Sequence, residues 1–370
     1  MKLIFLIDHL GFGGAQRQMV TLATLLAQRG HSVRVFIYHP HLTGLAEPLA
    51  AAGVEVVHES KTSRFSIGPP LAFARELRTE RYDAVLAFLR TPSLYAELAG
   101  TVARGTRIVV SERNGFPPGP VGLRTRLQVK LHRLADAVTV NAHHHREALE
   151  ALEPALIGRV AVIYNGVDLD RFSPGSAPVR VNPPHARRLL IASNTRAHKN
   201  VLGLCRALLV YADRYGTPPS VTWAGRISVG DADWNSLREG LKMLQSRGLD
   251  DRVSWLGQRV DVPELMRQHD AVLHPSLREG LPNAICEALA SGRPVLAHHF
   301  GDHPRLVEDG VSGYVFDAES PTEFATVLHR FQSLTDDEVL RMGRRARTFA
   351  ERELTPHRLV SSYERILMGH

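Results

Sequence analysis

Residues 271–297, AVLHPSLREGLPNAICEALASGRPVLA, contain in order an apolar run, a polar loop, a helical segment and a second apolar run. The first run, Ala271 to His274, and the last, Pro294 to Ala297, have the length and composition of buried strands. Between them, the helix is expected to begin around Pro282–Asn283, because proline is favoured in a first helical turn. Strand, helix and strand in this order predict a right-handed βαβ unit of a parallel sheet.

The same alternation extends over the rest of the chain. Strands are expected at Leu3 to Ile7, Ser32 to Tyr38, Val54 to Val57, Ala84 to Phe88, Arg107 to Ser111, Ala137 to Asn141, Val160 to Tyr164, Arg188 to Ser193, Ser220 to Ala224, Val253 to Gly257, Ala271 to His274, Pro294 to Ala297 and Gly313 to Phe316. A helix-like stretch follows most of them. The predicted class is therefore α/β, with two Rossmann-like domains.

A proline-rich stretch separates the two halves of the 370-residue chain, which is long enough for two cores. The sequence SPGSAPVRVNPPHAR at 173–187 carries four prolines and little apolar periodicity, as expected of an exposed connection. We predict an N-terminal domain at 1–172, a linker at 173–187 and a C-terminal domain at 188–354. Ligands of open parallel sheets bind at the carboxyl ends of strands, so the active site is expected in a cleft between the domains.

The formal net charge of +7 and the sequence pI of about 9.7 predict an anionic partner. Nucleic acid, a membrane surface and a phosphorylated substrate all fit that charge. No zinc-finger spacing, aromatic single-strand motif or long basic tail is present, so we do not expect nucleic-acid binding. The two cysteines, Cys205 and Cys286, sit in apolar helical patterns, which argues against a disulfide or a thiolate metal site.

No apolar run approaches the roughly 20 residues that span a bilayer. The apolar start of the chain turns polar at Asp8-His9, so it resembles a buried strand more than a signal peptide. We therefore expect a cytoplasmic protein.

The loop and helix that follow His274 have the features of a phosphate site. A strand-to-helix loop with Gly280 makes the helix start receptive to anions. Glu279 precedes that start and Glu287 lies one turn inside it. At 1.5 Å of rise per residue, the two carboxylates bracket the helix N-terminus by roughly 6 to 12 Å. We expect a diphosphate on the backbone N–H groups, with one glutamate on sugar hydroxyls and the other on ribose hydroxyls.

This segment is similar to the donor-site motif of glycosyltransferase family 4. The resemblance rests on Glu279 and Glu287 with seven residues between them, followed by Ala-Leu-Ala-Ser-Gly-Arg-Pro-Val. It extends over essentially the whole chain through Gly13-Gly14-Ala15-Gln16-Arg17, Asn165-Gly166-Val167-Asp168, Lys199-Asn200 and Leu256-Gly257.

The resemblance implies the GT-B fold and a retaining sugar transfer from a nucleoside diphosphate sugar, UDP-sugar being the expected donor. The expected acceptor is a hydroxyl of a glycan or lipid-linked precursor in cell-envelope or exopolysaccharide biosynthesis. It also implies that the C-terminal segment 355–370 returns to the first domain as a helix. No cofactor or metal ion is expected.

The resemblance also assigns roles to residues. Lys199, Arg196 and Glu279 are the expected catalytic groups, the two cations neutralising the departing diphosphate. Donor-binding residues are expected at Gly13, Gly14, Gly257, Gly280, Leu281, Pro282, Asn283, Ala284 and Glu287. Relatives commonly carry Gly-Arg five residues before the lysine, whereas this chain has Ser193-Asn194, which weakens the assignment of Arg196. For Gly13 and Gly14, a tight turn without ligand contact remains the alternative.

The acceptor side departs from the family pattern. Many members place a histidine after the fifth strand, where this chain reads Ser111-Glu112-Arg113-Asn114-Gly115. Glu112 is a candidate for orienting an acceptor hydroxyl, and Arg113 for contacting a phosphate. A structural ion pair is the alternative for both. The Gly-Gly-X-Pro-Glu turn of the family reads Gly301-Asp302-His303-Pro304-Arg305 here.

Several patterns that resemble metal sites are interpreted as structural. Asp168-Leu169-Asp170 matches a metal motif of another glycosyltransferase fold, but its position before the linker favours a turn. His143-His144-His145, and His298-His299 with His303, lack the carboxylate or cysteine spacing that would complete a site. No metal ligands are predicted.

The basic stretch LRTRLQVKLHRL at 123–134 places Leu123, Leu127, Leu131 and Leu134 at helical spacing. One interpretation buries the leucines and leaves Arg124, Arg126, Lys130, His132 and Arg133 on other faces. The other is a cationic helix that docks on the inner face of the cytoplasmic membrane, near a lipid-linked acceptor.

Two rival functions fit the same fold. A nucleotide-sugar epimerase would use the donor without an acceptor. A non-catalytic nucleotide-sugar-binding subunit would bind it without turnover, although the intact glutamate pair beside Lys199 speaks against this.

Overall fold

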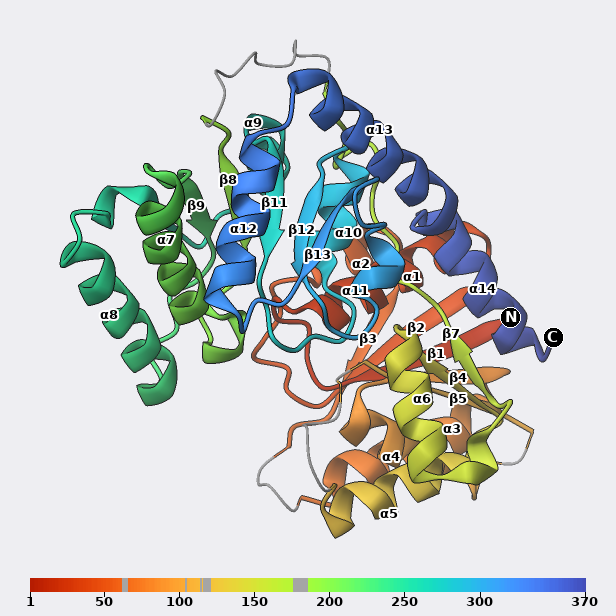
Figure 1. Cartoon of the computed structure of the whole chain (residues 1–370). Coiled ribbons are helices and arrows are strands. Elements are labelled where there is room, and N and C mark those ends of the chain that lie inside the picture. Colours follow the sequence, from red (N-terminus) through yellow and green to blue (C-terminus); the bar gives the residue numbers. More distant parts are fainter. Residues whose placement is uncertain (62–65, 104, 114, 116–120, 176–185) are drawn as a thin grey trace. The chain divides into compact units, whose positions relative to one another are not determined.

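The computed structural model describes residues 1–61, 66–103, 105–113, 115, 121–175 and 186–370. Most of the predicted linker, 176–185, therefore lies outside the described residues. The chain forms two compact units, the first from Met1–Gly166 with Pro356–His370 and the second from Val167–Thr355 (Figure 1). Both contain a parallel sheet with helices packed on it, which confirms the predicted α/β class.

The first unit has a seven-stranded sheet in the order β3-β2-β1-β4-β5-β6-β7. Its strands are β1 (Lys2–Ile7), β2 (Ser32–Ile37), β3 (Glu55–His58), β4 (Ala84–Phe88), β5 (Arg107–Glu112), β6 (Ala137–Val140) and β7 (Val160–Val162). Its helices are α1 (Gly14–Gln28), α2 (Glu47–Ala51), α3 (Gly68–Glu80), α4 (Arg90–Gly100), α5 (Leu123–Leu131), α6 (His143–Leu152) and α14 (Pro356–Met368), with short turns η1 (His132–Leu134) and η2 (Pro154–Leu156).

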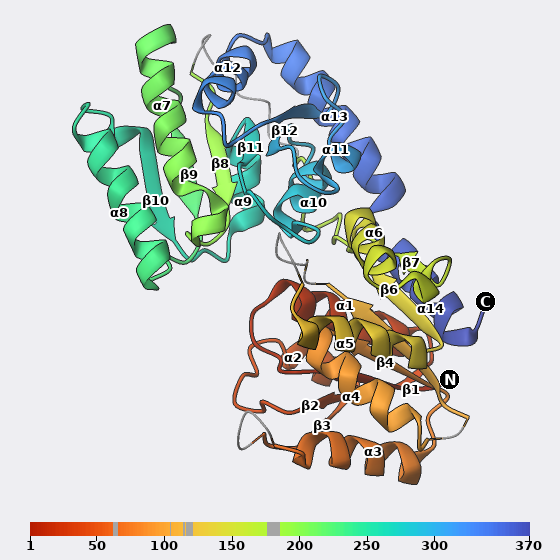
Figure 2. The same cartoon turned by 60° about the horizontal axis from the view of Figure 1, so that its bottom comes forward.

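Successive residues of a strand point to opposite faces of the sheet. In the first sheet both of these faces are buried. On β1, Leu3, Phe5 and Ile7 belong to one cluster, which also holds residues of α1 and α14. Ile4 and Leu6 belong to another, with residues of α3 and α4. The helices on these faces can be followed in Figure 2. Burial on both sides explains the continuous apolar strands of the sequence.

The C-terminal helix α14 is part of the first unit. It packs on α1, and the hydroxyl of its buried Tyr363 lies 3.2 Å from Ser111 Oγ and 3.3 Å from Thr139 Oγ1. A Cβ at Gly166 would lie 3.2 Å from Pro356 Cα, so the glycine gives this helix room.

The second unit has a six-stranded sheet in the order β10-β9-β8-β11-β12-β13. Its strands are β8 (Leu189–Ala192), β9 (Val221–Ala224), β10 (Val253–Gly257), β11 (Ala271–His274), β12 (Val295–His298) and β13 (Gly313–Phe316). Its helices are α7 (Val201–Tyr215), α8 (Asp231–Gln245), α9 (Val262–Gln268), α10 (Asn283–Ala290), α11 (His303–Leu306), α12 (Pro321–Gln332) and α13 (Asp336–Glu353), with turns η3 (Ala197–Lys199) and η4 (Asp250–Arg252).

The first unit ends at Gly166 and the second begins at Val167, whereas the sequence predicted the end of the first domain at residue 172. The intervening residues are bonded to the second unit. Val167 N donates to Leu354 O, and Arg347 of α13 donates to the carbonyls of Leu169 and Phe172. These bonds end on backbone groups of residues 167–172, so the side-chain composition of that stretch does not reveal them.

The basic helix differs from the interpretation that buries its leucines. Leu123 is 73% exposed and Leu127 54%, and Leu134 is exposed as well. The buried residues of this stretch are Val129 and His132, so His132 does not lie on a solvent face. Among the described residues, no helix combines the length and apolar character that a bilayer crossing requires.

Candidate active site

Two loops at the carboxyl ends of neighbouring strands bring Lys199 and Glu279 together in the second unit. Lys199 ends the turn η3 that follows β8, and Glu279 lies between β11 and α10. Because β8 and β11 pair in parallel, their following loops lie at the same edge, where Leu277 N donates to His198 O at 2.8 Å. Lys199 Nζ and Glu279 form a largely buried ion pair.

The charge of Glu279 is stabilised by its surroundings. Burial alone would raise the pKa of this carboxyl, but contact with His274 and the charge of Lys199 hold the pKa well below its usual range. His274 Nε2 lies 3.3 Å from Glu279 Oε1, and burial lowers the pKa of His274. Glu279 is therefore ionised at neutral pH, with Lys199 as the cation and His274 as a neutral neighbour.

The helix α10 starts four residues after Glu279. Pro282 is its N-cap residue, and the side chain of this proline makes no capping hydrogen bond. The N–H groups of a first helical turn and the helix dipole make such an end a ready anion site. Glu287 is the fifth residue of the helix and is largely buried, so the two glutamates do lie on either side of the helix start.

The other expected donor residues in this unit are distributed more widely. Gly280, Leu281, Asn283 and Ala284 form the loop and first turn of α10. Arg196 is exposed just before η3, and in the described part of the chain it forms no ion pair with Glu279. Gly257 ends the edge strand β10 with a φ of 65°, and its carbonyl accepts from Gly225 N.

Two histidines, His274 and His303, lie near Glu279. Neither was among the site residues predicted from the sequence. The rings of His274 and His303 are 5.4 Å apart, and His303 Nδ1 lies 2.7 Å from the carbonyl oxygen of His298. Burial lowers the pKa of His303 to about 3, so it is neutral at physiological pH. His274 ends an apolar strand five residues before Glu279, a position that could have signalled its role.

In the first unit, Gly13 and Gly14 begin α1 after β1. Gly13 is extended, and a Cβ there would lie 2.2 Å from Gln16 Oε1. Gln16 in turn donates to Asp8 at 2.9 Å. The glycine therefore allows Gln16 to fold back over the helix start.

Glu112, the last residue of β5, lies in a buried cluster. Its Oε2 is 3.5 Å from Arg90, and its Oε1 is 3.6 Å from His132 Nε2. His132 Nδ1 lies 2.5 Å from Glu97 Oε1. Although burial opposes the charge, the two carboxylates raise the pKa of His132 to about 9, whereas burial raises the pKa of Glu97. Neither carboxylate oxygen of Glu112 makes a hydrogen bond to a described residue.

Arg113 is buried beside this cluster without a carboxylate partner among the described residues. Its NH2 donates to Asn165 Oδ1 at 2.9 Å, and its guanidinium stacks 4.3 Å from the ring centre of Phe88. Its NH1 has no hydrogen-bond partner there, and burial lowers its pKa. A buried cation of this kind is costly unless an anion joins it.

Metal-ligand geometry occurs at one place among the described residues. Ligand atoms of His298, Asp317 and Glu319 lie within 4.8 Å of one another. However, His298 Nδ1 already lies 3.0 Å from the backbone N–H of Ala318, so that nitrogen is engaged.

Family models match both units. Residues 12–171 match "Glycosyltransferase Family 4", and residues 186–333 match "Glycosyl transferases group 1". The chain belongs to glycosyltransferase family 4. Both matches contain the motif residues on which the predicted resemblance rested, and the family assignment is confirmed.

Among curated relatives of this family 4 chain, a D-inositol 3-phosphate glycosyltransferase from Streptomyces avermitilis is 30% identical over 272 residues, covering 70% of this chain and 57% of the relative. A UDP-Gal:alpha-D-GlcNAc-diphosphoundecaprenol alpha-1,3-galactosyltransferase from Escherichia coli is 27% identical over 194 residues, covering 49% of this chain and 46% of the relative. The matched region thus spans about half the length of these relatives.

Solved structures show the same fold. Anabaena Alr3699/HepE in complex with UDP matches with a TM-score of 0.84 and 22% identity, covering all of both chains. The two-sheet GT-B fold that the sequence predicted is confirmed.

Proposed function

We propose that this protein is a retaining glycosyltransferase that moves a sugar from a nucleoside diphosphate sugar, UDP-sugar in the first instance, to an acceptor hydroxyl. The observation that carries the proposal is the ion pair of Lys199 with Glu279, four residues before the start of α10, in a family 4 chain. The UDP bound to the structural neighbour HepE supports the choice of donor base.

In the proposed sugar transfer, the protein acts mainly by stabilising the negative charge of the departing diphosphate. Breaking the glycosidic bond leaves negative charge on the diphosphate, which the N-terminus of α10 and Lys199 stabilise. Glu279 stays ionised and accepts hydrogen bonds from sugar hydroxyls, while Glu287 accepts from the ribose. The departing phosphate takes the acceptor proton, so no protein group must act as a base. Arg196, exposed before η3, adds positive charge once the donor is bound.

The acceptor is held by the first unit. Glu112 has two carboxylate oxygens free to accept hydrogen bonds from a hydroxyl, and Arg90 and His132 fix its position. Arg113 offers its guanidinium to an anionic group of the acceptor. The names of the two relatives specify a phosphate and a diphosphate on the molecules they act on, which supports an anionic acceptor.

The test uses a panel of UDP-sugars with and without phosphorylated polyol and lipid-diphosphate acceptors. UDP release that depends on acceptor, with a product whose anomeric configuration matches the donor, is expected. An isomerised sugar from donor alone would identify an epimerase. Donor binding without turnover on any acceptor would favour a non-catalytic subunit, and an inverted product would exclude the retaining mechanism.

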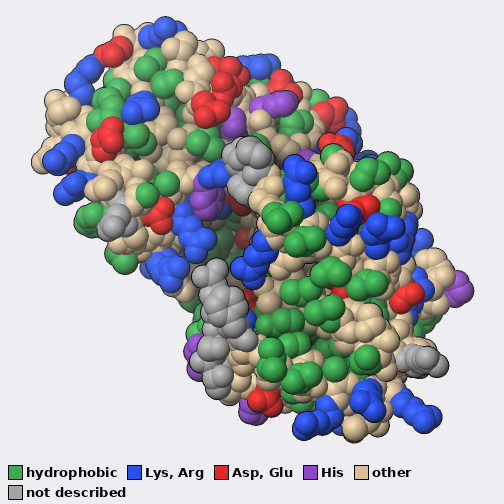
Figure 3. Space-filling view, turned by 90° about the horizontal axis from the view of Figure 1, so that it is seen from below, with side chains coloured by type: hydrophobic (Ala, Val, Ile, Leu, Met, Phe, Trp, Pro, Cys, Tyr) green, Lys and Arg blue, Asp and Glu red, His purple; other side chains and the backbone are tan. Residues whose placement is uncertain are grey.

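We also propose that α5 docks on an anionic membrane surface at the cytoplasmic face, as suits an enzyme that builds cell-envelope or exopolysaccharide precursors. Its exposed Leu123 and Leu127 lie among exposed Arg124, Arg126 and Lys130. Figure 3, seen from the α5 end of the view in Figure 1, shows hydrophobic side chains with lysine and arginine beside them. Apolar side chains among cations are typical of interfacial helices.

Sedimentation with phosphatidylglycerol vesicles measures this contact. We expect binding at low salt that falls as salt rises, and a loss of at least fivefold in Leu123→Ser/Leu127→Ser. Val260→Ser, which changes an even more exposed apolar residue in the second unit, is the control. A protein that stays in the supernatant at low ionic strength would contradict membrane docking.

A further inference from the structure

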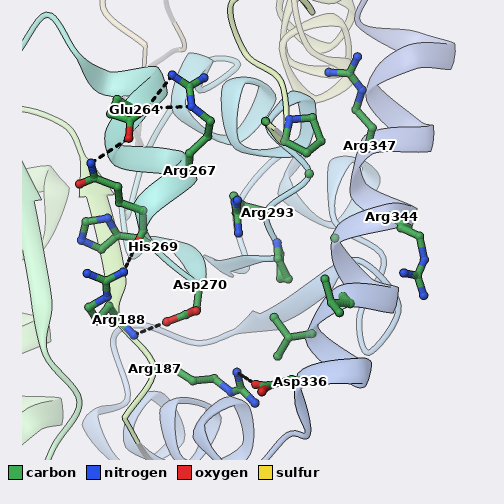
Figure 4. A pocket seen from close by; sticks show the side chains of 18 of the residues that line it. Arg187, Arg188, Glu264, Arg267, His269, Asp270, Arg293, Asp336, Arg344 and Arg347 are labelled. Carbon is green, nitrogen blue, oxygen red and sulfur yellow. Dashed lines mark hydrogen bonds and ion pairs between the residues drawn. The ribbon is translucent and has the colours of Figure 1, made fainter. Parts of the chain in front are cut away.

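A cavity of about 740 Å³ in the second unit is lined by six arginines, Arg187, Arg188, Arg267, Arg293, Arg344 and Arg347, against three carboxylates, Glu264, Asp270 and Asp336 (Figure 4). This arginine pocket has the volume of an ordinary small-molecule site. Its cationic excess sets it apart from a cavity that merely results from imperfect packing, which is usually apolar.

The arginine pocket lies at the opposite edge of the sheet from Lys199 and Glu279. Arg188 immediately precedes β8, Asp270 precedes β11, and Arg293 with Pro294 precedes β12. Lys199 and Glu279 follow the carboxyl ends of β8 and β11. A four-residue strand spans about 13 Å, so one ligand does not reach both places with its phosphate.

Helix α13 closes the other side of the arginine pocket. A Cβ at Gly343 would lie 2.3 Å from the carbonyl oxygen of Gly292, so only glycine lets α13 approach the loop before β12 this closely. The approach places Arg344 and Arg347 across from Arg293 (Figure 4).

Most of the arginines have partners. Arg187 pairs with Asp336 at 2.8 Å and Arg267 with Glu264 at 2.9 Å. Arg347 donates to three backbone carbonyls and pairs with Glu351. These bonds hold the three arginine side chains in place along the walls of the arginine pocket.

Two arginines differ from the rest. Among the described residues, neither Arg293 nor Arg344 forms a side-chain hydrogen bond or a close ion pair, and Arg293 Nε is buried without a hydrogen-bond partner. Burial lowers the pKa of Arg293, with Asp270 as its counter-charge. A half-buried guanidinium that carries five donors and uses none is placed for a ligand, because desolvation has been incurred without a bond.

We propose that the arginine pocket binds a phosphate-bearing small molecule, with Arg293 and Arg344 as the cations that engage it. Guanidinium groups match phosphate through paired N–H···O bonds, and several of them offset the two or more negative charges of a phosphate ester or diphosphate. The site is separate from the donor site and does not depend on the proposed transferase activity.

Titration calorimetry with inorganic phosphate and with pyrophosphate tests the proposal on the full chain. Arg293→Ala and Arg344→Ala are each expected to weaken one binding event at least tenfold. Arg345→Ala, the neighbouring exposed arginine of α13 outside the pocket, is the matched control and is expected to bind like the wild type. All three variants keep the donor site, so a difference between them belongs to the arginine pocket.

Thermal unfolding without anion checks that the variants are folded. Arg344→Ala is expected to unfold at the same temperature as the wild type, since the Arg344 side chain is exposed and bonds to none of the residues that the structure describes. Equal pyrophosphate affinity in all variants, equal losses in Arg345→Ala and Arg344→Ala, or no binding at all would overturn the proposal. Binding only to phosphatidylglycerol vesicles, lost in Arg344→Ala, would replace the small molecule with a lipid headgroup and overturn it too.

Discussion

Each unit places a buried glutamate near a histidine at the carboxyl end of a strand, yet the two clusters have opposite protonation. In the second unit, contact with His274 and the charge of Lys199 keep Glu279 ionised, and His274 itself is neutral. In the first unit His132 carries the charge, because Glu97 and Glu112 lie on both its sides. The charge of a buried imidazole thus depends on whether a stronger base, such as lysine, already balances the nearby carboxylate.

The difference suits the two proposed roles. In the donor cluster, by which we mean Lys199, Glu279 and His274, Lys199 is a cation at the place where we propose that the diphosphate gains negative charge. The acceptor cluster, by which we mean Glu97, Glu112 and His132, holds the carboxylate of Glu112 that we propose for the acceptor hydroxyl, buried beside the charge of His132. If the comparison is correct, changing the lysine in one cluster and a carboxylate in the other will affect different kinetic constants.

The largest effect is expected for Lys199→Met. Removing the cation at the diphosphate should lower kcat/KM for the donor by roughly 10² to 10³, as for other groups that stabilise developing charge. Steady-state kinetics measure it, with Lys242→Met on the exposed face of α8 as control. An unchanged kcat/KM in folded Lys199→Met would exclude Lys199 from the reaction.

A smaller effect is expected for Glu112→Gln. This change keeps the shape but removes the charge that Arg90 and His132 hold, so kcat/KM for the acceptor should fall roughly 10- to 100-fold. Slow hydrolysis of the donor in the absence of acceptor should not change. If hydrolysis falls as much as transfer, Glu112 serves the structure and not the acceptor.

The smallest effect concerns stability and pH. The pKa of His132 is about 9 in the folded chain and about 6.5 when unfolded, so its contribution is complete below pH 6.5 and lost as pH rises through 9. Between pH 7 and 8.5 the free energy of unfolding should fall by about 1 to 2 kcal/mol. Urea unfolding at several pH values measures this change. In His132→Gln, the free energy of unfolding should depend much less on pH over the same range. The same pH dependence in the wild type and in His132→Gln would mean that His132 is neutral in the folded chain.

Much of the donor region could be predicted from the sequence. Strand, loop and helix around Glu279 follow from local pattern, because apolar run length, a loop glycine and a proline at the helix start are properties of consecutive residues. The pairing of Lys199 with Glu279 was accessible only through the family motif, since 80 residues separate them.

The acceptor cluster could not be predicted in the same way. His132 comes from a stretch whose leucine spacing favoured burial of the leucines, but the histidine is buried and the leucines are exposed. Helical spacing states which residues share a face. It does not state which face meets the neighbouring helix, and here the buried pair of Glu97 and His132 joins α4 to η1.

The sequence by itself determined the alternation of strands and helices, the two parallel sheets and the motif of family 4, because these depend on periodicity and on short runs of residues. Only the tertiary structure decided which charges stay ionised, which arginines of the second unit lack partners, and that residues 167–172 belong with α13. Those properties depend on desolvation and on atoms brought together from distant parts of the chain, neither of which is encoded in local pattern.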